Sequence, residues 1–219
     1  MKNVLILSAH TDDDILGAGG AIQYFKEGKY KIYVCQVTDG CSSQYGDNPK
    51  ICKERNQQYQ KAMKFLKVDG IFNLDFPDMQ LDTIPHFQIN QDLNKIFKKT
   101  KPEILLTHSP DDINKDHQEI YKSTLVIIRP LNNFLKRVYS YETLSCSEWN
   151  PDSPFKPNYF IDIKKYLAKK KEAFGLLKTE LREYPHSRSL EGIEILAKYR
   201  GLQCGRRYAE AFRLIKGYD

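Results

Sequence analysis

Two clusters of histidine and aspartate side chains each follow an apolar run of the sequence. Residues 4–14 read VLILSAHTDDD, so His10 and three successive aspartates come directly after a short apolar run. Residues 107–117 read THSPDDINKDH and follow a second apolar run. Buried carboxylates are costly unless a cation or hydrogen bonds compensate them. Because imidazole and carboxylate groups are metal ligands, the two clusters together predict a single metal site.

His10, Asp13 and His117 are the predicted metal ligands. His10 and Asp13 stand three residues apart across a strand-to-helix turn, so both can reach one ion. Such a set leaves a position for water, whose pKa a catalytic metal lowers from about 15.7 toward about 7. Asp12 is not needed for the metal and is the candidate general base. Asp14 is expected at the helix start, where a carboxylate complements the helix dipole.

Short apolar runs alternate with longer amphipathic stretches along the chain. The predicted strands are 4–9, 32–37, 71–76, 103–107, 137–143 and 158–163. The predicted helices are 15–28, 51–67, 87–100, 117–129, 164–183 and 189–200, and YAEAFRLI at 208–215 closes the chain. This alternation predicts an α/β fold, a Rossmann-like, doubly wound, mostly parallel sheet with helices on both faces. Length and the lack of internal repeats predict a single domain over residues 1–219.

The order of the strands predicts that the two clusters meet. In a doubly wound sheet the first and fourth strands commonly lie side by side, and ligands bind at their carboxyl ends. The cluster that begins at His10 follows the first predicted strand, and the cluster that ends at His117 follows the fourth. The order of the strands therefore predicts that the two clusters contact each other.

The glycine-rich segment LGAGG at 16–20 has two interpretations. It is similar to a dinucleotide-binding fingerprint, but Ile22 stands where the third glycine belongs. The three aspartates beside it would also repel a pyrophosphate. We interpret these small residues as allowing the first helix to lie close to the sheet.

Composition argues against several classes of protein. The formal net charge is +6, and the densest basic run, KKYLAKKKEA at 164–173, is expected to be a solvated helix face and not a nucleic-acid site. No apolar run approaches the roughly 20 residues of a membrane span, and the N-terminus lacks the features of a secretory signal. The five cysteines lack paired C-x-x-C spacing, which argues against a disulfide framework and favours a reduced, cytoplasmic location. A homo-oligomer is compatible with the sequence.

The motifs resemble those of the PIG-L/LmbE-like metal-dependent N-deacetylases. That family carries AHPDDE and a second motif ending in DH, which stand here as AHTDDD at 9–14 and NKDH at 114–117. The resemblance continues through VTDG at 37–40, Arg55, LDFPD at 74–78 and RG…YAEAF at 200–212, and so covers essentially the whole chain.

This resemblance implies the same α/β fold and one Zn²⁺, or another divalent transition metal, on His10, Asp13 and His117. It implies further that Asp12 is the general base and that Arg55 and Asp78 meet a sugar. Without the resemblance, the sequence is about equally compatible with Arg55 as a substrate contact and with Arg55 as a solvated arginine on a helix.

Three residues depart from the family pattern. Thr11 replaces the proline of the first motif and Asp14 replaces its glutamate. Asn114 stands where several members carry a histidine that acts as general acid or stabilises the oxyanion. An asparagine can donate a hydrogen bond but cannot deliver a proton. Asp12, acting as both base and acid, or His108 is then left to protonate the leaving amine.

The leading function is hydrolysis of an N-acetyl group on an amino sugar or a sugar conjugate. In this hypothesis Asp12, Asn114 and Asp116 are catalytic, and Arg55, Asp78 and His108 bind the small-molecule substrate. A Mg²⁺ phosphatase of the haloacid-dehalogenase type is an alternative, because Asp12-x-Asp14, Thr38 and Asp111-Asp112 follow strands. Such an enzyme needs a lysine and has no use for His10 or His117. A non-catalytic metal-binding or sugar-binding relative is the third alternative.

Overall fold

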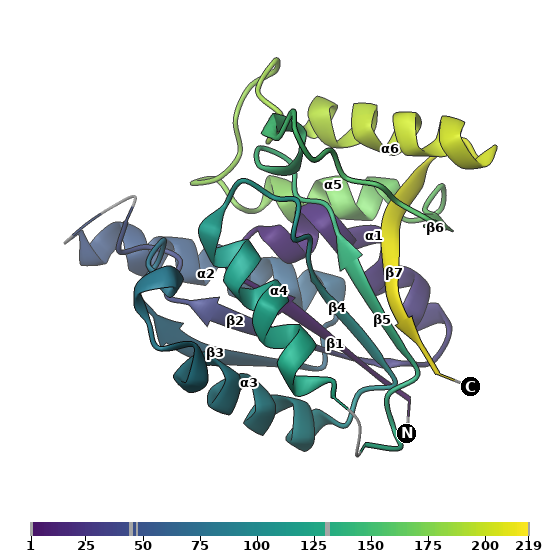
Figure 1. Ribbon diagram of the computed structural model, residues 1–219. Helices are drawn as coiled ribbons and strands as arrows, with labels where there is room; N and C mark the ends of the chain where they lie inside the picture. The colour runs from purple at the N-terminus through teal and green to yellow at the C-terminus, as the bar shows by residue number, and fades with distance from the viewer. Residues whose placement is uncertain (1, 44–45, 47, 130–131, 219) are drawn as a thin grey trace.

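A seven-stranded sheet lies between two layers of helices in the computed structural model, which describes residues 2–43, 46, 48–129 and 132–218 (Figure 1). The strands are β1 (Asn3–Ser8), β2 (Lys31–Thr38), β3 (Gly70–Phe76), β4 (Ile104–His108), β5 (Arg137–Tyr141), β6 (Tyr159–Asp162) and β7 (Ala209–Gly217). The helices are α1 (Asp13–Glu27), α2 (Pro49–Leu66), α3 (His86–Thr100), α4 (Lys115–Ile127), α5 (Leu167–Gly175) and α6 (Leu190–Cys204). Two short 3₁₀ helices, η1 (Leu81–Thr83) and η2 (Ser147–Trp149), complete the described elements.

The strand order is β3-β2-β1-β4-β5-β7-β6. Strands β1 to β5 pair in parallel, whereas β7 runs antiparallel to both β5 and β6. Val4 of β1 stands opposite Ile104 of β4, so the first and fourth strands are neighbours as the sequence predicts. Both helix layers are visible in Figure 1, with α3 and α4 in front of the sheet and α1 and α2 behind it.

The core has two parts because neighbouring residues of a strand point to opposite faces. Val4 and Ile6 of β1 pack into the part beneath α1, α2, α5 and α6. Leu5 and Leu7 pack into the part beneath α3 and α4. Burial on both faces explains why the central strands read as continuous apolar runs and not as alternating ones.

The glycines of α1 allow the helix to lie close to the sheet, as the sequence analysis proposes. A Cβ atom at Gly17 would stand 2.2 Å from the ring of Tyr141, and one at Gly20 would stand 2.5 Å from Ile163. The ring of Tyr141 is held in this place because its hydroxyl donates a hydrogen bond to the carbonyl of Leu7 at 2.7 Å. A larger residue at Gly17 would push α1 away from Tyr141 of β5, and one at Gly20 would push α1 away from Ile163, which follows β6.

The predicted helix over 164–183 is correct only in its middle. Helix α5 ends at Gly175, and the residues that follow form turns. The basic run is also not a wholly solvated face, since Lys170 is buried and pairs with Glu210 at 2.6 Å. Among the described helices none is long and apolar enough to cross a membrane. Segment 208–215, for which no element type was predicted, forms most of strand β7.

The cysteines differ from the expectation that they form no disulfide. Cys41 and Cys52 are bonded, with Cα atoms 5.6 Å apart, and tie the loop after β2 to the first turn of α2. Cys35, Cys146 and Cys204 are free. Sequence reasoning missed the bond because an odd number of cysteines says nothing about which two become neighbours. The cysteine-based argument for a reducing compartment therefore no longer stands, and a cytoplasmic location remains a prediction.

Candidate metal centre and cleft

Strands β1 and β4 bring the two sequence clusters together. His10 follows β1, Asp13 begins α1, and His117 lies in the first turn of α4 after β4. Asn114 fixes the start of α4, because its side-chain oxygen accepts a hydrogen bond from the backbone N–H of Asp116 at 2.9 Å. The convergence expected from the strand order is present.

The ligand atoms of His10, Asp13 and His117 form a tight triangle. His10 Nδ1 lies 3.1 Å from Asp13 Oδ2 and 3.3 Å from His117 Nε2. His117 Nε2 lies 3.2 Å from Asp13 Oδ2. Ligands held tetrahedrally at about 2.0–2.1 Å from a zinc ion stand roughly 3.3 Å from one another, so all three separations match such a site. The donor set and its spacing fit one divalent transition-metal ion with a further coordination position.

The surroundings of this triangle favour a positive charge. Burial disfavours the protonated imidazole of His117, but the charges of Asp13 and Asp112 outweigh burial and raise its pKa to about 9. Burial likewise opposes ionisation of Asp13, yet His117 and His10 hold the pKa of its carboxyl well below the usual range. A bound divalent cation would supply the charge that these carboxylates attract.

Asp112 orients His117, a role that the sequence analysis did not assign. Its Oδ2 atom lies 2.8 Å from His117 Nδ1 and accepts a hydrogen bond from the hydroxyl of Ser147 at 3.2 Å. Metal-binding histidines commonly use their second ring nitrogen in this way, which fixes the tautomer and the ring orientation. The sequence signal was an aspartate five residues before His117, but it lies in a loop that no periodicity describes.

Asp78 and Asp116 approach the other ring nitrogen of His10. His10 Nε2 lies 3.0 Å from Asp78 Oδ1 and 3.4 Å from Asp116 Oδ2. Both oxygens of Asp116 already accept backbone N–H groups, from Met79 at 2.7 Å and from Leu81 at 2.9 Å. Asp116 does not line the cleft, and its predicted catalytic role stays a prediction. It fixes the turn after β3 that carries Asp78.

His108 lies beneath the metal centre and not in the cleft. It is fully buried, and its ring stacks on His117 with centroids 3.7 Å apart. Its Nε2 atom accepts a hydrogen bond from the backbone of Ala9 at 2.9 Å. Burial and the neighbouring charge of His117 lower its pKa well below the usual value, so it packs as a neutral ring. His108 has no exposed surface and does not line the cleft, so the geometry gives no support to the predicted contact with substrate.

A cleft of about 190 Å³ opens beside the metal centre. Its lining brings the ligands His10 and Asp13 together with four other predicted site residues, namely Asp12, Arg55, Asp78 and Asn114. Asp12 lies at the N-cap of α1 and is buried except for 4 % of its surface. Two residues that sequence reasoning did not single out, Ser43 and Arg188, also line the cleft.

Four charged side chains, Asp12, Glu180, Arg55 and Arg188, form what we call the cleft cluster. Arg188 Nη1 lies 2.9 Å from Glu180 Oε2 and 3.4 Å from Asp12 Oδ2. Arg55 Nε lies 2.8 Å from Glu180 Oε1. Glu180 is fully buried, and burial raises its pKa although the two arginines oppose the shift. Two carboxylates and two guanidinium groups are therefore paired here, and three of the four side chains, Asp12, Arg55 and Arg188, line the cleft.

The loop after β2 holds Arg55 and Asp78 in place. Arg55, which is buried and not a solvated helix residue, donates a hydrogen bond to the carbonyl of Gly40. The hydroxyl of Ser43 donates to Asp78 Oδ2 at 2.6 Å. The Cys41–Cys52 bond ties this loop to α2 one turn before Arg55. Residues 44, 45 and 47 of this loop lie outside the described residues.

Several proteins similar to this chain are named as deacetylases. Residues 5–128 match the family model described as PIG-L, GlcNAc-PI de-N-acetylase. The chain belongs to this family. A diacetylchitobiose deacetylase of Thermococcus kodakarensis is 24% identical over 227 residues, covering 99% of this chain and 84% of the relative. The crystal structure of N,N'-diacetylchitobiose deacetylase from Pyrococcus horikoshii with an inhibitor superposes with a TM-score of 0.79 at 22% identity, covering 98% of this chain and 84% of that one.

Not every relative of this PIG-L family chain is named a deacetylase. A 4-oxalmesaconate hydratase of Pseudomonas putida is 27% identical over 198 residues, covering 76% of this chain and 71% of the relative. The family fold is therefore compatible with more than one use of its site.

Family membership removes the phosphatase alternative, and the geometry agrees. Asp14, the second carboxylate of the Asp12-x-Asp14 pair, is fully buried and does not line the cleft. It accepts hydrogen bonds from the hydroxyl of Tyr59 at 2.8 Å and from the backbone N–H of Ile15 at 3.0 Å. Among the described residues no lysine lines the cleft, although a phosphatase of that type needs one.

Proposed function

We propose that this protein is a metal-dependent N-deacetylase that removes the acetyl group from an amino sugar or an amino-sugar conjugate. One observation carries the proposal: the triangle of ligand atoms on His10, Asp13 and His117 lies beside the buried carboxylate of Asp12 in one cleft. The names of the similar deacetylases support the choice of an N-acetylated sugar. A zinc ion held by these ligands would supply Lewis acidity toward the amide carbonyl and make water more acidic.

Asp12 is the residue we assign to proton transfer. Asp12 lines the cleft and directly precedes the ligand Asp13 in the sequence. Three groups of side chains among the described residues could hold a metal, and Asp12 belongs to none of them. Arg188, 3.4 Å from Asp12 Oδ2, restricts the orientation of this carboxylate. Asp12 takes a proton from the attacking water and returns it to the amine as the amide C–N bond breaks.

Asn114 is assigned to binding and not to proton donation. Its oxygen caps α4, so its amide nitrogen is the part left to donate, and this nitrogen lies 3.4 Å from the sulfur of Met79 at the cleft. We propose that it donates a hydrogen bond to the carbonyl oxygen of the acetyl group, which gains negative charge during attack. No second acid is required if Asp12 performs both transfers.

Arg55 and Asp78 are assigned to the sugar. Both line the cleft, and a sugar presents hydroxyl groups that pair with a guanidinium donor and a carboxylate acceptor. Asp78 is anchored by Ser43, and Arg55 by Glu180 and Gly40, so neither has to be ordered when substrate binds.

A hydratase is the second candidate, because one relative carries that name. It would use the same ligands and base to add water to a carbon–carbon double bond. Such a substrate would be an unsaturated carboxylate, for which the arginines Arg55 and Arg188 are the available partners in the cleft.

The deciding experiment measures acetate release from a panel of N-acetylated sugars and disaccharides, with and without a chelator. We expect release that a chelator abolishes and that added Zn²⁺, Co²⁺ or Mn²⁺ restores. Asp12→Asn should lose this activity, whereas Asp82→Asn, a matched exposed aspartate in η1, should keep it. Consumption of an unsaturated dicarboxylate without any acetate release would favour the hydratase. Metal binding without turnover of either class would favour the non-catalytic alternative.

A further inference from the structure

A second cavity lies at the end of the sheet opposite the metal centre. It has a volume of about 380 Å³, within the range of about 300–1,000 Å³ that small-molecule sites occupy. Ile104 and Arg137, the first residues of β4 and β5, lie in its lining, and Tyr30 precedes β2. A parallel strand of this length spans roughly 16 Å, so a small molecule in this cavity does not reach the cleft at the other strand ends.

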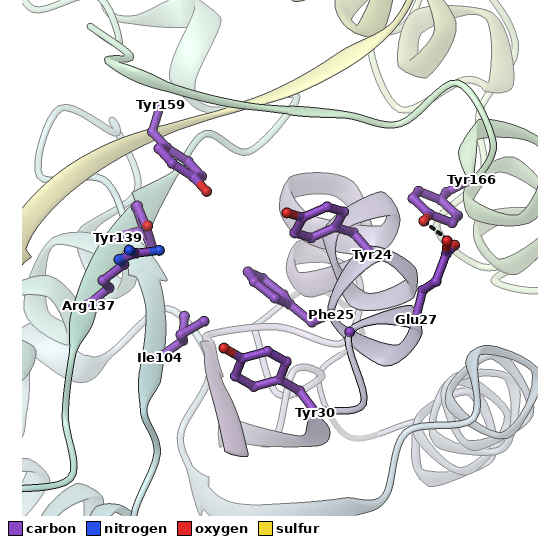
Figure 2. Close-up of a pocket in the computed structure, with 10 residues that line it drawn as sticks. Tyr24, Phe25, Glu27, Tyr30, Ile104, Arg137, Tyr139, Tyr159 and Tyr166 are labelled. Carbon is purple, nitrogen blue, oxygen red and sulfur yellow. Dashed lines mark hydrogen bonds between the residues drawn. The ribbon is translucent and has the colours of Figure 1, made fainter. Parts of the chain in front are cut away.

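Aromatic rings form two walls of this cavity, which we call the aromatic pocket (Figure 2). On the sheet side, Tyr139 of β5 and Tyr159 of β6 lie with ring centroids 4.7 Å apart. On the helix side, Phe25 near the end of α1 contacts Tyr24 and Tyr30, with centroids 5.4 and 5.6 Å away. The space between the walls is open. Phe25 and Tyr139 are buried, whereas Tyr24, Tyr30 and Tyr159 keep part of their surface exposed.

Polar groups face the same space. The hydroxyl groups of Tyr24 and Tyr159 point from opposite walls toward the middle of the pocket (Figure 2). Tyr24 is 43% exposed, and among the described residues its hydroxyl has no hydrogen-bond partner. Glu27 on the rim accepts a hydrogen bond from the hydroxyl of Tyr166 at 2.5 Å. Arg137 stands on the opposite side of the pocket.

These groups discriminate between classes of ligand. A purely apolar ligand would remove the phenol hydroxyls from water without replacing their hydrogen bonds, which is costly. A cation, which aromatic walls otherwise attract, is opposed by Arg137 and by Lys2, whose Nζ atom lies 5.5 Å from the ring centroid of Tyr30. A saccharide ring presents flat C–H faces for the aromatic walls and a rim of hydroxyl groups for the tyrosines.

We propose that the aromatic pocket binds a neutral saccharide ring and is a second carbohydrate site of this protein, separate from the cleft. The proposal does not depend on the deacetylase assignment, because none of the pocket residues belongs to the cleft. A sugar chain or glycoconjugate held there would raise the local concentration of related sugars around the enzyme, as bivalent attachment does.

The test is a titration of the metal-free protein with cellobiose, followed by backbone amide shifts in nuclear magnetic resonance. Cellobiose has no N-acetyl group, so the result does not depend on deacetylation. We expect saturable shifts for residues at the C-terminal end of α1 and the start of β5. Tyr24→Ser removes one ring from the wall and should weaken binding about tenfold, whereas Tyr24→Phe keeps the ring and should weaken it about threefold. Tyr199→Ser, another exposed tyrosine that lies outside the pocket, is the control and should bind as the parent does.

Three results would overturn the proposal. The first is no shift in the pocket up to the solubility limit of cellobiose. The second is equal binding by Tyr24→Ser and the parent, with melting temperatures and circular dichroism that show both to be folded. The third is a change in sedimentation caused by Tyr24→Ser, which would identify the pocket as an interface between copies of the chain. Binding of cellobiose by a protein that releases no acetate would refute only the deacetylase assignment.

Discussion

Two buried groups of charged side chains in this protein are built in different ways. The first group, which we call the helix cluster, consists of Lys170 and Glu210. These two side chains lie 2.6 Å apart, and each also hydrogen-bonds to the backbone of α1. Lys170 donates to the carbonyl of Leu16 at 2.7 Å, while Glu210 accepts the N–H groups of Gly20 and Ala21 at 2.8 and 2.7 Å. These two side chains fully engage each other and the helix.

The cleft cluster is less tightly closed. Asp12 has its nearest cation, Arg188, at 3.4 Å, and the side chain of Arg188 is 20% exposed. Asp12, Arg55 and Arg188 all line an open cleft, whereas Lys170 and Glu210 fix α1 against the C-terminal strand. Charge burial alone therefore does not identify a catalytic site. The charged groups that keep a face toward an open cavity are the ones available to a substrate.

Substitution of Asp12 should have the largest effect on this contrast. Asp12→Asn keeps the shape of the side chain but removes the base, and we expect kcat to fall by about 10²–10⁴-fold. Metal content and melting temperature should stay close to those of the parent. Metal analysis and calorimetry on the purified variant check this. Loss of the metal would instead make Asp12 a ligand, and unchanged turnover would exclude it as the base.

Substitution in the helix cluster should show the opposite pattern. Lys170→Ala leaves Glu210 buried without its cation, which we expect to cost about 3–5 kcal/mol of the free energy of unfolding. The activity per folded molecule should be retained, because neither residue lines the cleft. Denaturant unfolding together with activity at low temperature measures both quantities. Lys198→Ala, an exposed helix lysine, is the control. A variant as stable as the parent would show that the helix cluster does not hold α1 in place.

The buried Asp14 predicts how stability depends on pH. Burial, with the charge of Asp13 adding to it, raises the pKa of Asp14 to about 7 although the hydrogen bond from Tyr59 opposes the shift. The folded state therefore binds a proton that the unfolded state releases near pH 4. The contribution of Asp14 to stability should be greatest below this value and should fall by a few kcal/mol as the pH rises to about 7. Asp14→Asn should flatten the curve for the metal-free protein, and an unchanged curve would contradict the shift.

Arg55 combines the features of the two clusters, because it pairs with a buried carboxylate and also lines the cleft. Arg55→Ala should raise KM about tenfold and lower the free energy of unfolding by about 1–3 kcal/mol. Steady-state kinetics and unfolding on one preparation separate the two effects. A change in stability alone would remove Arg55 from substrate binding and leave it a structural role through Glu180 and Gly40.

Much of this site follows from the sequence, and the rest depends on irregular segments. The neighbouring places of His10 and His117 follow from strand order, since parallel strands with intervening helices allow few arrangements. Glu180 and Arg188 could not be predicted, because they lie in turns between α5 and α6 where no periodicity fixes a direction. Asp112 was missed for the same reason.

The structural contacts of Asp116 and His108 were also not predictable from residue type. Each is a ligand-type side chain near the metal centre, but the backbone groups that they engage become neighbours only in the folded chain. The Cys41–Cys52 bond and the aromatic pocket are products of tertiary contact in the same sense. Sequence pattern located most of the elements, while their exact ends and the side chains that converge from loops required the structure.

The most direct test measures metal binding and turnover together, in the parent protein and in His117→Ala. The parent protein, stripped with a chelator, should bind one equivalent of Zn²⁺ by calorimetric titration and regain acetate release at that same equivalent. His117→Ala should neither bind this equivalent with comparable affinity nor release acetate, while its circular dichroism shows it folded. Full activity of the stripped parent, or undiminished metal binding by His117→Ala, would contradict the assignment of His10, Asp13 and His117 as the metal site.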